Sequence, residues 1–287
     1  MHDALIAGQI ALTLLLAGAG SAMEGFARLM HTPLCYDPHN IVSVGVPLHK
    51  SAFPAWAARA AYFEQLRASV AGTPGVTMAA ISSNATPPRN GSNLRFELLG
   101  KSSTDQQMGS INLVDPGYFP ALRIPLLQGR LWSGTENQNA AHVAVINQTL
   151  ARSYFPNGDA VGHSVKLPDI ESRPPEVLSA PGIADAWLMI VGVVADARND
   201  GLRKPVKPAV FIPYTLSMSE GTQILARSDV PPLTLMDAVG KQVSTVNPEQ
   251  QIYNSVDDLS VWISEEPEWQ QDHLVSWIFG LSSRCWA

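Results

Sequence analysis

The sequence predicts an α+β fold that follows an N-terminal membrane-spanning helix. Short apolar runs with a period of two, typical of half-buried strands, alternate with apolar stripes at offsets of three and four, typical of helices. An uncharged run of twenty residues, 4–23, precedes them, and about twenty is the length that a helix needs to cross a bilayer. With 287 residues, 46% of them apolar, the chain can bury a sizeable core in one large or two small domains.

The N-terminal run leaves three interpretations open. A spanning helix is favoured because the run is longer than the core of an ordinary signal peptide, and because residues 1–3 include no Lys or Arg. The small residues Ala17, Gly18 and Ala19 resemble a cleavage site, so a cleaved signal peptide is the second interpretation. A buried core helix is the third.

Composition excludes several kinds of function. Charged residues make up 15% of the chain and the formal net charge is −6, so no basic surface indicates nucleic acid as a partner. The seven histidines are scattered without tight Cys/His spacing, and we therefore predict no metal site and no cofactor. The two cysteines, Cys35 and Cys285, are far apart in the sequence, and we expect no disulfide between them.

The first elements form a βαβ-like unit, which should have a right-handed connection. Residues 40–46 alternate with period two and predict a strand, and residues 76–81 predict a second one. The helix between them has an apolar face made by Trp56, Ala60, Phe63, Leu66 and Val70. On its opposite face we expect Arg59, Glu64 and Arg67.

A corner at Asp115-Pro116-Gly117 follows a polar loop, 82–93, and two further strands, 94–98 and 110–114. Pro presets φ, Gly tolerates a positive φ, and Asp can accept from its own downstream backbone, so a tight turn is predicted. A short helical turn then presents Tyr118, Phe119 and Leu122 on one side and must end at Ile124, because the residue before a proline avoids the α region.

The second half continues the alternation. Four strands are predicted at 142–146, 187–194, 209–213 and 223–227. Asn147 is a good N-cap for a helix that ends at Phe155, and a last helix spans 236–246 before Asn247-Pro248. Residues 187–194 are apolar without alternation, which predicts a central strand buried on both faces. Residues 168–181 are rich in Pro, Ser and Glu and predict a mobile surface loop.

No catalytic residue is assigned. The chain has no P-loop, no GxSxG and no HExxH sequence. Asp196, Arg198 and Asp200 follow a buried strand, a place that can hold a ligand in open sheets, but a solvated turn is the favoured interpretation. His142 and His163 are given no role. Six aromatic residues are assigned to the core rather than to a substrate cage: Trp56, Phe63, Tyr118, Phe119, Tyr154 and Phe155.

Three ordered runs resemble one known family. They are VDPGYFPALRIPLLQGR at 114–130, VAVINQTLARSYFPNGDAVG at 143–162 and IVGVVADAR at 190–198. The first is similar to the segment usually seen as VSPGYFxxLGIPLLxGR in the periplasmic core domain of MacB-like, FtsX-type ABC transporter permeases. The match looks closest to the duplicated orphan permeases described in acidobacteria.

The resemblance implies a division of the chain. Residues 1–30 would be the transmembrane helix and stalk, and 31–265 the periplasmic core domain, with porter-like parts at 38–116 and 187–260 and an inserted sabre-like subdomain at 117–186. This division requires the strand at 187–194 to pair with a strand before Gly117. Apolar residues 274–281 are too few to span a bilayer, and the family implies that 266–287 is the start of a second transmembrane helix, cut short by a truncation or a frameshift.

The function implied by the resemblance is mechanical. The domain would lie in the periplasm, anchored in the bacterial inner membrane by a single N-terminal span. It would pass on movement driven by a separate ABC-type ATPase subunit to export a substrate, as a homodimer or paired permease, with a periplasmic adaptor as a further partner. We expect no enzyme activity of its own, and we expect this form of the chain to be inactive in transport. A membrane-anchored module that binds a peptide or a lipid is the alternative, and an unrecognised hydrolase a weaker one.

Overall fold

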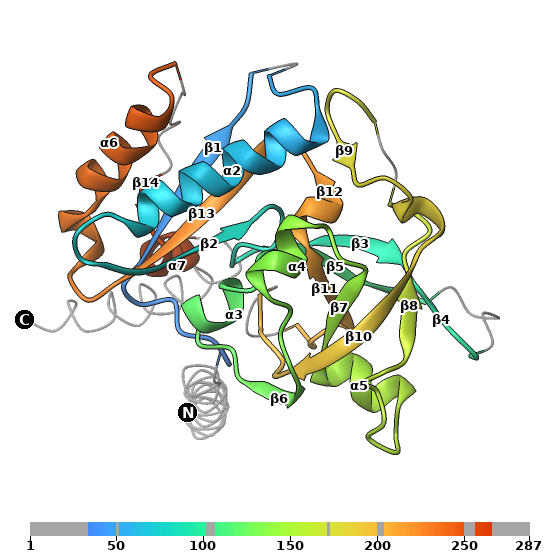
Figure 1. Ribbon diagram of the computed structural model, residues 1–287. Helices are drawn as coiled ribbons and strands as arrows, with labels where there is room; N and C mark the ends of the chain where they lie inside the picture. The colour runs from blue at the N-terminus through green and yellow to red at the C-terminus, as the bar shows by residue number, and fades with distance from the viewer. Residues whose placement is uncertain are drawn as a thin grey trace, which may run out of the picture.

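A computed structural model describes residues 34–49, 52–101, 107–170, 173–199, 204–249 and 256–265 (Figure 1). These residues form a mixed α+β fold, as the sequence predicts. Among them we find no helix with the length and hydropathy of a membrane span. The predicted span at 4–23 and the predicted start of a second transmembrane helix at 266–287 lie outside the described ranges.

One large sheet of twelve strands organises the described residues. Its strands are β1 (Ile41–Pro47), β2 (Val76–Ser82), β3 (Ser92–Arg95), β4 (Glu97–Leu98), β5 (Met108–Val114), β6 (Leu126–Gly129), β7 (Val143–Asn147), β8 (Ser164–Lys166), β10 (Trp187–Val194), β11 (Ala209–Pro213), β13 (Gly221–Ser228) and β14 (Val256–Asp258). They follow one another in the order β14-β1-β13-β2-β5-β11-β7-β10-β8-β4, while β3 pairs with β5 and β6 with β10. Two short strands, β9 (Leu178–Ser179) and β12 (Ser217–Met218), form a separate pair.

The helices lie where the apolar stripes predict them. They are α2 (Trp56–Ala71), α3 (Tyr118–Ala121), α4 (Gly134–Gln138), α5 (Gln148–Tyr154), α6 (Met236–Val246) and α7 (Leu259–Glu265). Three 3₁₀ turns are η1 (Ile183–Asp185), η2 (Tyr214–Leu216) and η3 (Pro232–Thr234). The predicted strands are confirmed to within a few residues, except that the one predicted at 94–98 is divided into β3 and β4. The sequence patterns did not indicate seven further helices and strands of the described residues: α4, α7, β6, β8, β9, β12 and β14.

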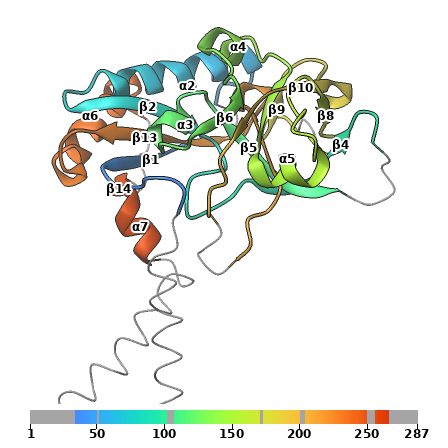
Figure 2. The same ribbon diagram turned by 90° about the horizontal axis from the view of Figure 1, so that it is seen from below.

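The first part of the sheet is β1, β13 and β2. Both β1 and β2 run antiparallel to β13, so they are parallel to each other with β13 between them. Figure 2 shows α2 and α6 together above these strands and α7 below them. The side chains of Val42, Val44 and Ile224 face the helices and pack against Phe63 of α2 and Val239 of α6. The predicted strand, helix and strand are therefore present, with one later strand inserted between the two strands.

The predicted polar face of α2 is wrong at Arg59. This side chain is fully buried, and its guanidinium donates to main-chain carbonyl oxygens. The acceptors are Pro175 at 2.8 Å, Met218 at 3.1 Å and Glu176 at 3.3 Å. A cation can be buried when neighbouring carbonyls replace its hydration. Helical spacing alone does not reveal such acceptors, because they come from segments more than a hundred residues away.

The segment 168–181 is predicted to be a mobile surface loop, but most of its described residues pack against the core. Residues 171 and 172 are outside the described ranges, but Ile170, Leu178 and Ala180 are buried in the core. The chain closes on itself at Arg173 and Val177, whose backbones bond each other in both directions at 2.9 and 2.8 Å. Arg59 holds the carbonyls between these two residues from the inside. The segment is thus a wall of the domain.

The second part of the sheet is built on β7 and β10. The predicted N-cap at Asn147 is confirmed, because its side chain accepts from Leu150 N at 3.0 Å at the start of α5. Asp196 caps the same helix a second time, accepting from the backbone and hydroxyl of Thr149 at 2.9 and 2.8 Å. The favoured interpretation of Asp196 as a solvated turn residue missed this contact, which needs β10 beside β7.

The predicted pairing of the strand at 187–194 is wrong. In the described residues β10 pairs with β7, β8 and β6, all from within 117–186, and with no strand before Gly117. The strand that returns to the first half is instead β11, which pairs with β5 in parallel and with β7 antiparallel. Strand β10 has neighbours on both sides, yet Trp187 and Met189 at its start are exposed, so it is buried on both faces only from Ile190 onward.

Candidate functional site

The segment by which the chain enters the domain, 34–40, is bonded to three distant parts of the fold. Asp37 N donates to Leu122 O at 2.8 Å, just after α3. Leu34 O accepts from Arg198 N at 3.1 Å, in the loop after β10. At its other end Asn40 O accepts from the backbone N of Ser228, the last residue of β13, at 2.9 Å. The entry segment is therefore fixed to the body of the domain before β1 begins.

Arg227, near the end of β13, fastens the entry segment to α3. Its side chain is 8% exposed. The Nε atom donates to Ala121 O, Nη1 to His39 O at 3.1 Å and Nη2 to Asp37 O at 2.6 Å. The Asp37 carboxylate lies 3.4 Å from Arg227 Nη1 and 2.8 Å from Nη1 of the exposed Arg123. Burial lowers the pKa of Arg227 while Asp37 opposes that shift, and an arginine stays charged in either case.

The segment by which the chain leaves the described domain lies beside the entry. Strand β14 pairs antiparallel with β1, with Val256 opposite Val44 and Asp258 opposite Val42. The last residue of β14 is therefore level with the start of β1. Asp258 then caps α7, accepting from the backbone and hydroxyl of Ser260 at 2.9 and 2.7 Å. Entry and exit thus lie at the same end of one strand pair (Figure 2).

An apolar cluster joins the two segments to the corner that the sequence predicts at 115–117. Leu259 and Ile263 of α7 share it with Tyr36 of the entry segment and Ile41, the first residue of β1. The corner contributes Tyr118, Phe119 and Leu122, all at most 1% exposed, so the predicted apolar side of the helical turn is confirmed. We call the entry segment 34–40, α3 with residues 122–124, Arg227 and residues 256–265 the junction.

A buried carboxyl group stands directly before α3. Asp115 is 5% exposed, and its Oδ2 lies 3.8 Å from Nε of Arg67 on α2. Arg67 is held in turn by Glu64, with contacts of 2.5 and 2.9 Å, and donates to Ala79 O at 3.2 Å. Burial raises the pKa of Asp115 to about 7, against the opposing effect of Arg67. The corner therefore carries a group that changes charge near neutral pH.

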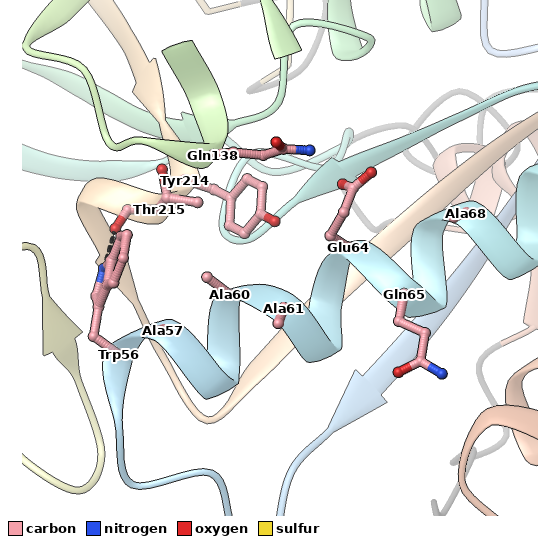
Figure 3. A pocket seen from close by; sticks show the side chains of 10 residues that line it. All are labelled: Trp56, Ala57, Ala60, Ala61, Glu64, Gln65, Ala68, Gln138, Tyr214 and Thr215. Atoms are coloured by element: carbon pink, nitrogen blue, oxygen red, sulfur yellow. Dashed lines mark hydrogen bonds between the residues drawn. The ribbon is translucent and has the colours of Figure 1, made fainter. Parts of the chain in front are cut away.

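A groove of about 520 Å³ runs between α2, α4 and η2, on the α2 side of the sheet (Figure 3). Its floor is made by small side chains of α2, Ala57, Ala60 and Ala61, and Trp56 Nε1 donates to Thr215 O at one end. The side chains that line it among the described residues include no Ser, Cys, His or Lys. Such a groove offers mainly apolar contact, and the hydroxyl of Thr215 in its lining already donates to Asn137 O, which favours binding over covalent chemistry.

The other residues that the sequence singles out are not brought together. The ring of His163 packs against that of Phe155 in a tilted arrangement, with centroids 4.9 Å apart, and His142 precedes β7 at the surface. Arg198 bonds the entry segment through its backbone, while Asp200 and Cys285 lie outside the described residues. Of the six aromatic residues assigned to the core, Trp56 and Tyr154 are half-buried and the other four are buried. Among the described residues no three His, Cys, Asp or Glu side chains converge as a metal site would require.

The comparison with protein families decides what this fold is. The family model of the MacB-like periplasmic core domain matches residues 6–246. The chain belongs to that family. It therefore contains the periplasmic domain of a MacB-like ABC transporter permease, and the family that three ordered runs predict is confirmed. No curated protein sequence matches this member of the family.

Comparison with solved structures finds one whose similarity supports the MacB-like fold. The periplasmic region of MacB from Actinobacillus actinomycetemcomitans matches with a TM-score of 0.50 and 12% identity, covering 83% of this chain and 99% of that one. The extracellular domain of the noncanonic ABC-type transporter YknZ from Gram-positive bacteria also matches, with a TM-score of 0.44 and 12% identity over 73% of this chain and 96% of that one. At 12% identity, the similarity to the periplasmic region of MacB shows the fold alone.

Proposed function

We propose that this MacB-like domain transmits movement and does not catalyse a reaction. Residues 4–23 would anchor it in the bacterial inner membrane with the domain in the periplasm. A separate ABC-type ATPase subunit would supply the movement, and export of a substrate would be the result. The observation that carries the proposal is the junction, in which the entry segment and the exit segment lie side by side at one end of β1 and β14.

The contacts of the junction suit rigid-body transmission. A displaced stalk moves the domain as a unit only if the connecting segment is bonded firmly to the core. Here Arg227 fixes the entry segment with hydrogen bonds to two of its carbonyl oxygens, and Asp37 adds an ion pair. The exit segment is fixed by strand pairing and by burial of Leu259 and Ile263. None of these contacts needs a reactive group.

The arrangement of subdomains and partners is also part of the proposal. We retain a porter-like part and an inserted sabre-like part, but move the boundary between them. Because β10 pairs with β7, and β11 with β5, the chain would return to the porter-like part at β11 rather than at residue 187. A homodimer or paired permease and a periplasmic adaptor remain the proposed further partners. The alternative function, a membrane-anchored module that binds a peptide or lipid, gains support from the groove along α2.

ATP turnover tests the transmission. Because this form of the chain is expected to be inactive in transport, the domain would be placed in a permease with two complete membrane helices, purified with its ABC-type ATPase and reconstituted in proteoliposomes. Arg227→Gln should lower turnover severalfold, because the entry segment loses its charged anchor. Arg130→Gln is the matched control, since it removes one exposed arginine that pairs with Glu136 outside the junction.

A folding defect must be separated from a loss of coupling. Circular dichroism melting would be measured for both variants, and Arg123→Gln would serve as a milder junction variant because that side chain is 67% exposed. Turnover unchanged in folded Arg227→Gln would refute transmission through the junction.

Membrane placement needs its own experiment. In a Cys285→Ser chain, the exposed Cys35 should react with an impermeant maleimide in intact spheroplasts. Mass measurement of the mature chain should show residues 1–23 still present. A Cys35 that reacts only after the membrane is opened would contradict the periplasmic location, and a chain that starts near Ser21 would contradict the anchor.

A further inference from the structure

A second cavity, of about 480 Å³, lies between β3, β5 and the described residues 169–170 and 173–177. Its lining includes the aliphatic side chains of Leu94, Ile111 and Leu113, the hydroxyl of Ser217 and the charged side chains of Asp169 and Arg173. The volume is within the range of about 300–1,000 Å³ that is typical of small-molecule sites. Unlike the groove along α2, this cavity combines aliphatic side chains, hydroxyl groups and two opposite charges.

The cavity exists because the sheet opens between β2 and β3. Strand β2 reaches β5 only at Ser82, and β3 covers β5 only up to Ile111. In the gap, the side chain of Asn84 takes the place of a strand, donating to Ile111 O at 3.0 Å and accepting from Leu113 N at 2.8 Å. The backbone of β5 is thus satisfied, and its aliphatic side chains, the half-buried Leu113 and the buried Ile111, form the floor of the cavity.

Two charges of opposite sign line the cavity without pairing with each other. The guanidinium of Arg173 makes no hydrogen bond or ion pair in the part of the chain that the structure describes. Asp169 is oriented by Arg95, whose backbone N donates to Oδ2 at 3.1 Å. The other oxygen, Oδ1, forms an exposed ion pair with Arg95 Nη2 at 3.8 Å, longer than a hydrogen bond. The Arg173 guanidinium and the Oδ1 atom of Asp169, which accepts no hydrogen bond from a described residue, can therefore still bind a ligand.

The wall that carries Arg173 is held in place from within. Its backbone and that of Val177 bond each other in both directions, and the buried guanidinium of Arg59 binds the carbonyls of Pro175 and Glu176 between them. A third bond from Arg59 to Met218 O ties the wall to β12, which contributes Ser217 to the cavity. A site whose walls are fixed before binding loses less entropy when the ligand enters.

We propose that this cavity binds a small zwitterion with an aliphatic side chain, an amino acid or a dipeptide with both ends free. Arg173 receives the carboxylate, Asp169 receives the ammonium group, and the floor at Leu94, Ile111 and Leu113 takes the aliphatic side chain. The inference goes beyond the transmission of movement and does not depend on it, because binding can be measured without an ATPase.

Calorimetric titration with L-leucyl-L-leucine tests this, using the full chain in mild detergent. N-acetyl-leucyl-leucine lacks the ammonium group, and leucyl-leucine amide lacks the carboxylate. Loss of one charge-assisted hydrogen bond should weaken binding about tenfold or more. Asp169→Asn should therefore weaken the binding of the free dipeptide but leave the binding of the N-acetyl form unchanged. Arg173→Gln should weaken the binding of the free dipeptide but leave the binding of the amide form unchanged.

Arg152→Gln is the matched control, because it removes an exposed arginine of α5 that does not line the cavity. Thermal melting would show that each variant is folded, which is expected because Arg173 is exposed and Asp169 is 44% exposed. No binding of leucyl-leucine at 10 mM would overturn the proposal. The proposal would also be overturned if the N-acetyl and amide forms bound as tightly as the free dipeptide, or if Arg152→Gln weakened binding as much as Arg173→Gln.

Discussion

Asp115→Asn should change how stability depends on pH. In the folded chain burial raises the pKa of Asp115 from 3.8 to about 7. The folded state therefore holds this proton more tightly than the unfolded state does. The stability that this tighter proton binding contributes is fully present below about pH 4 and falls as pH rises toward 7. Above about pH 7 it is lost and changes no further. Three pKa units correspond to roughly 4 kcal/mol, which is the upper limit of the effect.

Asparagine keeps the shape of the neutral acid but cannot ionise, so the variant lacks this pH-dependent loss. The variant minus wild-type difference in unfolding free energy should therefore rise with pH, by at most about 1.4 kcal/mol per unit between pH 4 and 7. Urea unfolding of the full chain in mild detergent at pH 4.5, 6 and 8 measures this difference, in which all other titrating groups cancel. A difference that is the same at all three pH values would refute the burial argument for Asp115.

Three further changes test contacts described above. Arg59→Met should lower the free energy of unfolding by about 3 kcal/mol, because it leaves one buried and two partly buried carbonyls without this donor. A loss below about 1 kcal/mol in urea unfolding would contradict a stabilising role for these hydrogen bonds. Glu136→Gln should lower the free energy of unfolding by about 1 kcal/mol at pH 7 and by nothing near pH 2. Arg130 and the Ser133 amide lower the pKa of Glu136 to about 2, so the stability that the carboxylate adds above pH 4.5 is lost as pH falls toward 2. Equal losses at both pH values would contradict this ion pair's contribution. Asn147→Ala should lower the free energy of unfolding by about 2 kcal/mol, because the side-chain amide caps α5 and also bonds the backbone just before and within β11. Amide hydrogen exchange at the start of α5 should become faster in the native state, and unchanged exchange would show that the cap is not needed.

Local chemistry was sufficient to predict most elements of the fold. The corner at 115–117, the cap at Asn147 and the helix over 236–246 follow from φ preferences, a side-chain acceptor and an apolar period. All of these signals act within a few residues. The structure confirms them because tertiary packing does not have to overrule them.

The errors concern contacts between distant segments. Arg59 has the helical spacing of an exposed residue, and the carbonyls that allow its burial come from the turn at 173–177 and from Met218. The apolar run of β10 predicts burial but cannot state which strands lie beside it, and it pairs within 117–186. Alternation and composition carry no information on strand order, so the return to the first half was placed one strand too early.

The junction could not be predicted residue by residue for the same reason. Asp37 and Arg227 are 190 positions apart in the sequence, and neither belongs to a recognisable motif. Strand β14 is three residues long, too short to show a period, and it becomes visible only through its pairing with β1. The sequence did predict the apolar side of α3, the part of the junction that depends on neighbouring residues.

The central claim is that the junction and the domain move as one unit when the ATPase turns over. A disulfide between Ser43→Cys and Asp257→Cys, at paired positions of β1 and β14, tests it in a chain whose Cys35 and Cys285 are replaced by serine. In the proteoliposomes described above, ATP turnover of the oxidised chain should equal that of the reduced chain, because a rigid junction never needs to separate these strands. Turnover that stops on oxidation and returns with a reductant would show that β14 must part from β1, and would contradict rigid transmission.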